Sequence, residues 1–177
     1  MQNHSQIFNN LKRYNDKQII RSCESKGSVI GTMVELKGIT KENIDDVLQL
    51  KVSETQKDFV SSTAHSLALA YVYRKTAYPF AIYADDIIVG FVMLGYYKKK
   101  AQYTLWKFLI DAQYQNRGYG RESLKLAIHY LAENFKVKEV FTGVAFQNAA
   151  AKHLYSSFGF KETGAFDGAQ LEMKLTL

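Results

Sequence analysis

The chain has 177 residues, of which 47% are hydrophobic and 14% aromatic, and its formal net charge is +6. This length suits one domain with a substantial core, and the longest apolar runs have strand length, so we expect neither a transmembrane helix nor a membrane partner. Half of the charge excess falls in the first 32 residues, where five basic side chains accompany two acidic ones, and the remaining 18 basic against 15 acidic side chains are too balanced for a nucleic-acid binder.

The first 32 residues are polar and differ in composition from the rest of the chain. They contain no continuous apolar core, so no signal peptide is expected, and their Cys23 is the chain's only cysteine and cannot form an internal disulfide. Leu11 to Arg21 has a thin apolar face that allows one helix. We expect residues 1–32 to be an N-terminal extension, either non-native or a packing arm, and residues 33–177 to form one cytoplasmic domain.

The domain is expected to open with a strand over Met33 to Lys37, followed by two helices. Thr40 is a suitable N-cap for the first helix, which we predict from Glu42 to Lys51. The second helical stretch runs from about Ser62 to Lys75. Five aromatic residues in and after it are interpreted mainly as core, although they also suit the wall of an amine tunnel: Tyr71, Tyr73, Tyr78, Phe80 and Tyr83.

A long β-hairpin and a central strand are predicted next. Tyr78 to Tyr83 and Ile87 to Tyr97 form the hairpin, with Asp85-Asp86 at its turn. Lys98-Lys99-Lys100 lies where a second turn is expected, so we interpret this basic run as solvated. The central strand is predicted from Tyr103 to Ile110.

A glycine-rich turn comes after the central strand, with the sequence Gln115-Asn116-Arg117-Gly118-Tyr119-Gly120. Its glycines allow positive φ and a close backbone approach to a ligand. The helix predicted from Arg121 to Phe135 begins directly behind them, and its free N–H groups and dipole create an anion site. Arg117 and Arg121 add positive charge, so a pyrophosphate is the expected ligand. The turn is not a Walker A loop, because it contains no Gly-Lys-Ser/Thr, and it lacks the third glycine of the dinucleotide fingerprint.

The remaining elements are a strand, a helix and a hairpin. We predict the strand from Glu139 to Val144 and the helix from Asn148, its N-cap, to about Phe158. Phe160 to Thr163 and Gln170 to Leu175 are the final strands, with Asp167-Gly168 near their turn. Together the elements predict an α/β fold, a mixed sheet with helices on both faces.

Two of these segments carry a family resemblance. Gln-x-x-Gly-x-Gly, followed by Asn-x-x-Ala-x-x-Leu-Tyr-x-x-x-Gly-Phe, resembles the GNAT superfamily of acetyl-CoA-dependent N-acetyltransferases, over roughly residues 33–177. The resemblance implies acetyl-CoA as co-substrate, no metal, and a GNAT-like sheet in which two parallel strands splay apart. These are the strands predicted at Tyr103 to Ile110 and Glu139 to Val144. Backbone N–H groups left unpaired on the first strand then bind the pantetheine arm.

Three shorter stretches resemble bacterial spermine/spermidine acetyltransferases: Glu54 to Val60, Ser66-Leu67-Ala68, and Trp106 to Asp111. This narrower resemblance implies a small amine substrate, with a polyamine such as spermidine or spermine preferred, and the family commonly forms homodimers. The alternatives on the same fold are acetylation of a protein N-terminus or lysine, acetylation of an aminoglycoside or amino-acid amine, and a non-catalytic acyl-CoA-binding sensor.

The resemblance also implies the cofactor site. Main-chain groups at the end of the central strand line the acetyl-pantetheine channel, and the glycine-rich turn holds the pyrophosphate. Asn148 caps its helix or contacts the pantetheine, and Lys152, one helical turn on, meets the cofactor phosphates or lies on the surface. The residues expected to bind the cofactor are Leu109, Ile110, Gln115, Asn116, Arg117, Gly118, Tyr119, Gly120, Arg121, Asn148 and Lys152.

Acetyl transfer to an amine needs a neutral amine and a proton for the departing thiolate. Tyr155 occupies the Leu-Tyr position where the family places its acid, and a phenol with a pKa of about 10 is protonated at neutral pH. The alternative is a tyrosine that only packs its ring and hydrogen-bonds the sulfur. Glu54 is the candidate base, spaced i, i+4 from Asp58, so that a helix would place both on one face. The other candidates are Asp58, a water chain, and three residues that also suit turns: Asp85, Asp86 and Asp111.

Overall fold

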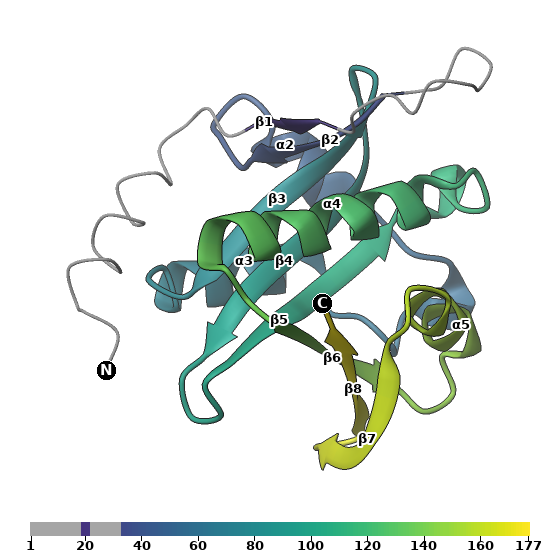
Figure 1. Ribbon diagram of the computed structural model, residues 1–177. Coiled ribbons are helices and arrows are strands. Elements are labelled where there is room, and N and C mark those ends of the chain that lie inside the picture. Colours follow the sequence, from purple (N-terminus) through teal and green to yellow (C-terminus); the bar gives the residue numbers. More distant parts are fainter. Residues whose placement is uncertain (1–18, 22–32) are drawn as a thin grey trace, which may run out of the picture.

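Figure 1 shows the computed structural model, which describes residues 19–21 and 33–177. A sheet of eight strands runs through it in the order β1-β2-β3-β4-β5-β6-β8-β7. Neighbouring strands are antiparallel throughout, except that β5 and β6 are parallel. The strands are β1 (Ile19–Arg21), β2 (Val34–Gly38), β3 (Ala77–Ala84), β4 (Ile87–Tyr97), β5 (Gln102–Ile110), β6 (Glu139–Ala145), β7 (Lys161–Asp167) and β8 (Gln170–Thr176).

Helices cover both faces of this sheet (Figure 1). α4 (Tyr119–Phe135) crosses one face, whereas α2 (Ile44–Gln49) and α3 (Thr63–Val72) lie on the other. α5 (Ala149–Ser157) connects β6 to the C-terminal hairpin. The mixed α/β fold expected from the sequence is therefore confirmed.

The alternation of side chains along the central strand β4 divides the core into two layers. Val92 and Leu94 point to the α4 side, where they join the cluster that contains Leu124. Phe91 and Met93 point to the opposite side and join a cluster with Val47 of α2. β4 is thus buried on both faces, and it anchors β5, which carries the candidate site.

The strands lie close to their predicted positions, but the first two helices are shorter. α2 begins two residues later than predicted, because the Asn43 side chain holds the preceding residues in a turn. Its Oδ1 accepts a hydrogen bond from the Thr40 backbone N–H at 2.8 Å, and its Nδ2 donates to the Gly38 carbonyl at 2.9 Å. α3 ends at Val72 rather than Lys75, and four turn residues lead into β3.

The N-terminal part of the chain supplies one edge strand. Ile19–Arg21 forms β1, which pairs antiparallel with β2, so the helix predicted over Leu11 to Arg21 is wrong at its end. The remainder of the predicted extension, residues 1–18 and 22–32, lies outside the described residues. The division of the chain at residue 33 therefore stays a prediction.

Candidate active site

The parallel strands β5 and β6 separate after a short contact. Only Thr104 and Leu105 of β5 pair with β6, opposite Phe141 and Thr142. Beyond that point β5 stays paired with β4 as far as Ile110, and β6 stays paired with β8 to its end. The ribbons diverge accordingly in Figure 1. The splayed pair expected from the sequence is present, and beyond Leu105 none of the described strands pairs with this edge of β5.

A β-bulge marks the point of separation. Leu105 pairs with Leu94, but the next pairing joins Lys107 to Met93, so Trp106 is an extra residue on β5. The Trp106 ring packs edge-on against Tyr73 at a centroid distance of 5.5 Å, on the α3 side of the sheet. The bulge thus turns the strand where the gap opens.

A tyrosine lies buried at the apex of the gap. The Thr142 hydroxyl donates a hydrogen bond to the Leu105 carbonyl at 3.1 Å, so a side-chain contact joins β5 and β6 at their last paired residues. Tyr155 of α5 is 5% exposed and contacts Phe160 at a ring distance of 5.6 Å. Burial raises the pKa of Tyr155 to about 12, although a hydrogen bond with the Thr142 side chain opposes the shift. The phenol is therefore a neutral donor at the point where the strands part.

The predicted glycine-rich turn connects the end of β5 to α4. Asn116 and Gly118 adopt left-handed backbone conformations, with φ of 62° and 85°. Gly118 is the N-cap of α4 and offers no side-chain hydrogen bond to the helix, so N–H groups of the first turn remain available to a ligand. A Cβ on Gly118 would meet nothing within 4 Å, so the space before the helix is open.

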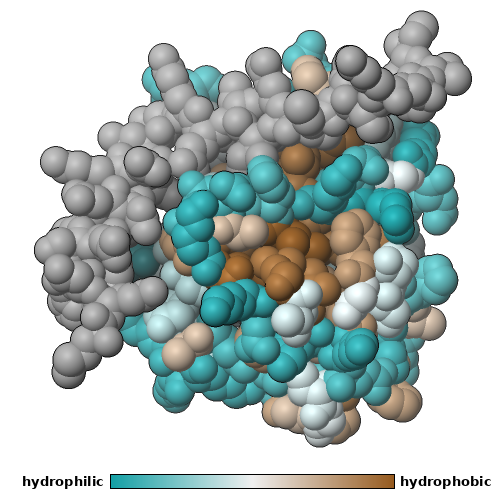
Figure 2. Space-filling view, viewed as in Figure 1, coloured by the Kyte–Doolittle hydropathy of each residue, from teal (hydrophilic) through white to brown (hydrophobic). Residues whose placement is uncertain are grey.

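Gly120 packs the helix start against its neighbours. A Cβ there would lie 3.7 Å from the side chains of Ile110 and Leu154, which is ordinary contact. Tyr119, the first residue of α4, is part-buried and packs against the core. Figure 2 shows apolar side chains gathered beside α4, over β5. This apolar surface lies along the splayed edge, where the resemblance places the pantetheine channel.

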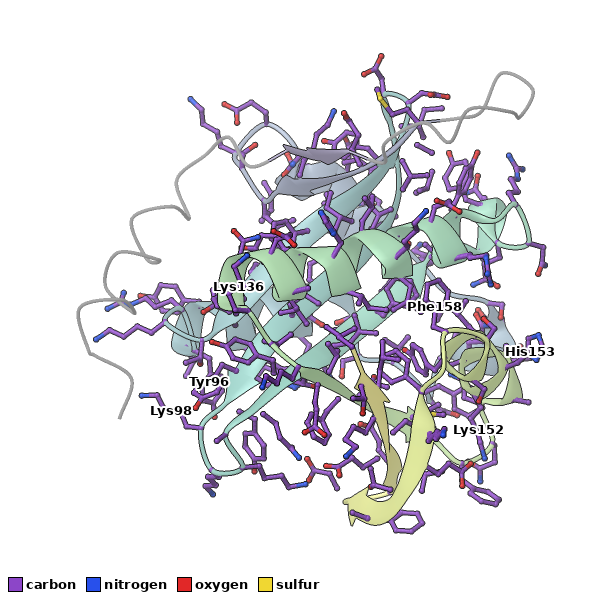
Figure 3. The ribbon with its side chains drawn as sticks, viewed as in Figure 1. Tyr96, Lys98, Lys136, Lys152, His153 and Phe158 are labelled. Atoms are coloured by element: carbon purple, nitrogen blue, oxygen red, sulfur yellow. The ribbon has the colours of Figure 1, made fainter. Side chains whose placement is uncertain are left out.

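The side chains around the turn are of two kinds, an internal brace and two cations that lie over aromatic rings, one of which, Arg121, also donates a hydrogen bond to Ser157 Oγ at 3.3 Å. Gln115 Nε2 donates to the Ile110 carbonyl at 2.9 Å and to Gln56 Oε1 at 2.8 Å, which ties the turn to the 3₁₀ turn η1 (Glu54–Gln56). Arg117 lies 5.6 Å from the Tyr114 ring, and Arg121 lies 5.0 Å from the Phe158 ring. Figure 3 shows Phe158 beside the N-terminal half of α4. Both guanidinium groups therefore lie next to the candidate anion site.

Two predicted cofactor residues on α5 have partners within the protein. Asn148 is the N-cap of α5, and its Oδ1 accepts a hydrogen bond from the Ala151 backbone N–H at 3.1 Å. Lys152 forms an ion pair with Glu162 of β7 at 2.8 Å and lies 5.2 Å from the Phe146 ring. Figure 3 shows Lys152 beside β7. The contacts of both residues with a cofactor stay predictions.

The base candidates are separated by the structure. Glu54 belongs to a 3₁₀ turn, so no helix aligns it with Asp58, and its side chain is 82% exposed in an ion pair with Lys57. Asp85 lies in the β3–β4 turn and accepts a hydrogen bond from the Met33 N–H at 3.1 Å. The role of Glu54 as a base stays a prediction.

Asp111 is buried and has a structural role. Its two carboxylate oxygens accept backbone hydrogen bonds from Lys51 at 2.8 Å and from Gln113 at 2.9 Å.

Asp111→Asn leaves one of these N–H groups facing an amide NH₂, so the free energy of unfolding should fall by about 1–3 kcal/mol. Urea denaturation measures this change. If Asp111 only holds the turn, the pH dependence of turnover in the variant should equal that of the wild type. A changed pH dependence would instead indicate that Asp111 acts as a base.

A cavity of about 490 Å³ opens on the α3 side of the sheet, next to the bulge. It lies between the β4–β5 turn, the first half of β5, and strands β6 and β8; Figure 3 marks this end with Tyr96 and Lys98. No sequence pattern indicated this cavity, and of its lining residues only Tyr73 belongs to the aromatic set that suits an amine tunnel. Its lining includes Tyr73, Tyr96, Lys98, Lys100, Gln102, Leu105, Trp106, Lys107, Thr142, Gly143, Asp167, Gln170 and Glu172.

Gly143 lies beneath the Gln170 side chain at the cavity floor. A Cβ on Gly143 would lie 2.5 Å from Gln170 Oε1, so a larger residue there would displace the end of this side chain. Leu105 and Thr142 border both the cavity and the apex of the gap. A small molecule in the cavity and a cofactor in the gap would therefore meet near Tyr155.

Two findings bear on metals and membranes. Within residues 19–21 and 33–177, no three His, Cys, Asp or Glu side chains gather into a group that could hold a metal ion. None of the helices in those ranges is both long enough and apolar enough to cross a membrane.

Comparison with known proteins places the chain among acetyltransferases. A family model described as an acetyltransferase (GNAT) domain matches residues 32–172. A spermine/spermidine N(1)-acetyltransferase of Bacillus subtilis (strain 168) is 32% identical over 143 residues, which cover 76% of this chain and 91% of the relative. A probable spermine N(1)-acetyltransferase of Bacillus subtilis subsp. natto matches equally, at 32% over the same length.

Solved structures share the fold. Spermidine N-acetyltransferase from Vibrio cholerae, in complex with CoA and spermine, has a TM-score of 0.65 at 17% identity and covers 81% of this chain and 95% of its own. PaiA N-acetyltransferase from Thermoplasma acidophilum, in complex with coenzyme A, has a TM-score of 0.60 at 17% identity and covers 81% and 99%. These likenesses support the architecture of the sheet and the splayed strand pair.

Proposed function

Because the chain belongs to the GNAT family and is an N-acetyltransferase, we propose that it transfers the acetyl group of acetyl-CoA to a primary amine of a polyamine such as spermidine or spermine. The observation that carries the proposal is the splayed strand pair, with the buried Tyr155 at its apex and a cavity against its other side. The polyamine is supported by the curated relatives, both of which are named for spermine.

Acetyl-CoA suits the residues on the α4 side of the gap. The uncapped start of α4 at Gly118 offers N–H groups and a positive dipole end to the diphosphate, and Arg117 and Arg121 add charge. On the exposed edge of β5 at Leu109 and Ile110, the Ile110 carbonyl is already taken by Gln115, so this edge has main-chain N–H groups to offer to the carbonyls of the pantetheine arm. Asn148 and Lys152 lie further along, on α5, and we keep them as secondary contacts.

The amine enters from the cavity on the α3 side and meets the thioester at the bulge. Its nitrogen attacks the carbonyl carbon, the C–N bond forms, and the C–S bond breaks. Tyr155 gives its proton to the departing sulfur and recovers one afterwards, because burial keeps the phenol protonated. The amine proton leaves through water, for which Glu54 is the candidate acceptor.

We also propose that the protein forms a homodimer, as is common in the family.

An amine panel tests this proposal by following thiol release from acetyl-CoA. Spermidine and spermine should give a kcat/KM at least about tenfold above that of a simple monoamine, because their additional amines contact the polar rim of the cavity. The panel also contains an aminoglycoside and a peptide with a free N-terminus. A faster reaction with either of these would replace the polyamine, and thiol release with none of the amines would identify an acyl-CoA-binding sensor.

A further inference from the structure

Lys107 has no role in the function described above, although it lines the cavity beside the gap. We propose that Lys107 is a specificity-determining residue: its ammonium group lies next to the acceptor amine and selects the neutral form, so that transfer proceeds without a carboxylate base in the cavity. This inference rests on the proposed amine acetylation at the same site.

The position of Lys107 results from the bulge in β5. It lies two residues beyond the last β5–β6 pair, and it is paired across the sheet with Met93, whose side chain packs on the α3 side. Its Nζ donates a hydrogen bond to Ser61 Oγ at 3.1 Å, and Ser61 belongs to the segment just before α3. Trp106 and Thr142 border the cavity beside it. The ammonium is thus held on the acceptor side of the gap.

The charge of Lys107 is not neutralised by a neighbouring carboxylate. Within the described ranges it takes part in no ion pair, and its partner Ser61 is a neutral hydroxyl. Burial is the cause that lowers the pKa of Lys107, without a contribution from a nearby charge. From the segment that carries Ser61, Glu54 faces Lys57 in an ion pair, and Asp58 is exposed.

The other charged groups that line the cavity come from the β4–β5 turn, from β7 and from β8. Lys98, Lys99 and Lys100 come from the β4–β5 turn, and Asp167 comes from the end of β7. Glu172 is occupied, because its carboxylate accepts hydrogen bonds from Lys100 at 2.9 Å and from the Thr163 hydroxyl at 3.0 Å. Beside the bulge the cavity therefore presents the Lys107 ammonium, and its Glu172 carboxylate is already engaged.

A cation at this place acts directly on the reacting group. A like charge disfavours the protonated form of an amine, so the pKa of a bound ammonium falls beside Lys107. Only the neutral amine has the lone pair that attacks the thioester. The same repulsion weakens binding of a polyamine, whose other ammonium groups must stay away from Lys107. Lys107 thus raises the reactive fraction of the bound amine and lowers the affinity for the cation.

Lys107→Met tests this inference, because methionine keeps much of the length and removes the charge. At pH 7 we expect kcat with spermidine, or with whichever primary amine ranks first in the panel, to fall about tenfold while KM for that amine also falls. The alkaline rise of kcat, which reports the bound amine, should move up by about one pH unit. A purely structural lysine would lower kcat without moving this rise or would increase KM.

Three further variants separate charge from packing. Lys107→Arg keeps the charge and should restore the position of the kcat rise, and Ser61→Ala removes the hydrogen bond but should leave the rise in place. Lys125→Met removes an exposed charge on α4, outside the cavity, and controls for net charge. An unchanged kcat rise in Lys107→Met overturns the inference while the acetylation stands. Thiol release by none of the amines with the wild type instead removes the proposed function.

Discussion

Tyr155→Phe should lower kcat by about 10²-fold and leave KM for acetyl-CoA nearly unchanged. Phenylalanine keeps the ring packed against Phe160 and removes only the hydroxyl at the apex of the gap. If that hydroxyl protonates the leaving sulfur, its loss raises the barrier for C–S cleavage without disturbing the turn at Gly118. Steady-state thiol release, with acetyl-CoA binding measured separately by calorimetry, provides both values.

Tyr130→Phe is the matched control for this experiment. Tyr130 is also buried and has a pKa raised to about 12 by burial, but it lies on α4 in the core, where its ring contacts Phe80 at 5.0 Å. Its loss should leave kcat within about twofold, because its hydroxyl is remote from the transfer point. Equal losses in the two variants would attribute the effect to packing, and an unchanged kcat in Tyr155→Phe would remove the acid assignment.

The raised pKa of Tyr155 also fixes the sign of its pH dependence. A phenol whose pKa has risen from 10 to about 12 remains protonated throughout the range from pH 6 to 10. Ionisation of Tyr155 therefore cannot cause a loss of kcat in this range, and the rise of kcat with pH belongs to the amine. A decline of kcat between pH 8 and 9 that disappears in Tyr155→Phe would contradict the burial argument.

The order of elements was predictable because each depends on local patterns. Ile87–Tyr97 is apolar and β-rich and has the bounds predicted for it. The splay required the family resemblance, since nothing local in β5 shows where β6 departs. Lys107 was missed for the same reason. A lysine in a strand is normally interpreted as solvated, and only the position where β6 departs shows that this lysine borders the gap. Its hydrogen-bond partner, Ser61, is 46 residues away in sequence.

The segment around Glu54 shows how tertiary contacts override a local pattern. The i, i+4 spacing of Glu54 and Asp58 suits a helix, but a stretch this short gains little from helical hydrogen bonds alone. The structure instead fixes the segment at two points, where Gln56 accepts from Gln115 and Ser61 accepts from Lys107. Both anchors lie on or after β5, so this segment is shaped by the site that it borders.

Gly118→Val should raise KM for acetyl-CoA by about 10²-fold, the loss expected from two charge-assisted N–H contacts to the diphosphate. A β-branched residue does not tolerate the φ of 85° at this position, so the turn must rearrange and its N–H groups turn away from the helix axis. The new side chain also occupies the open space before α4. Fluorescence or calorimetric titration with coenzyme A measures the affinity without turnover.

The matched control is Gly164→Val, because it imposes the same backbone strain elsewhere. Gly164 has a φ of 80° in the exposed strand β7, and a Cβ there also meets nothing within 4 Å. Both variants should lose comparable stability, about 1–2 kcal/mol, since the cost of the left-handed conformation is local. Only Gly118→Val should lose affinity for coenzyme A. Equal affinity in the two variants would place the diphosphate away from the turn. The proposed path of the thioester from the turn to Tyr155 would then also be wrong.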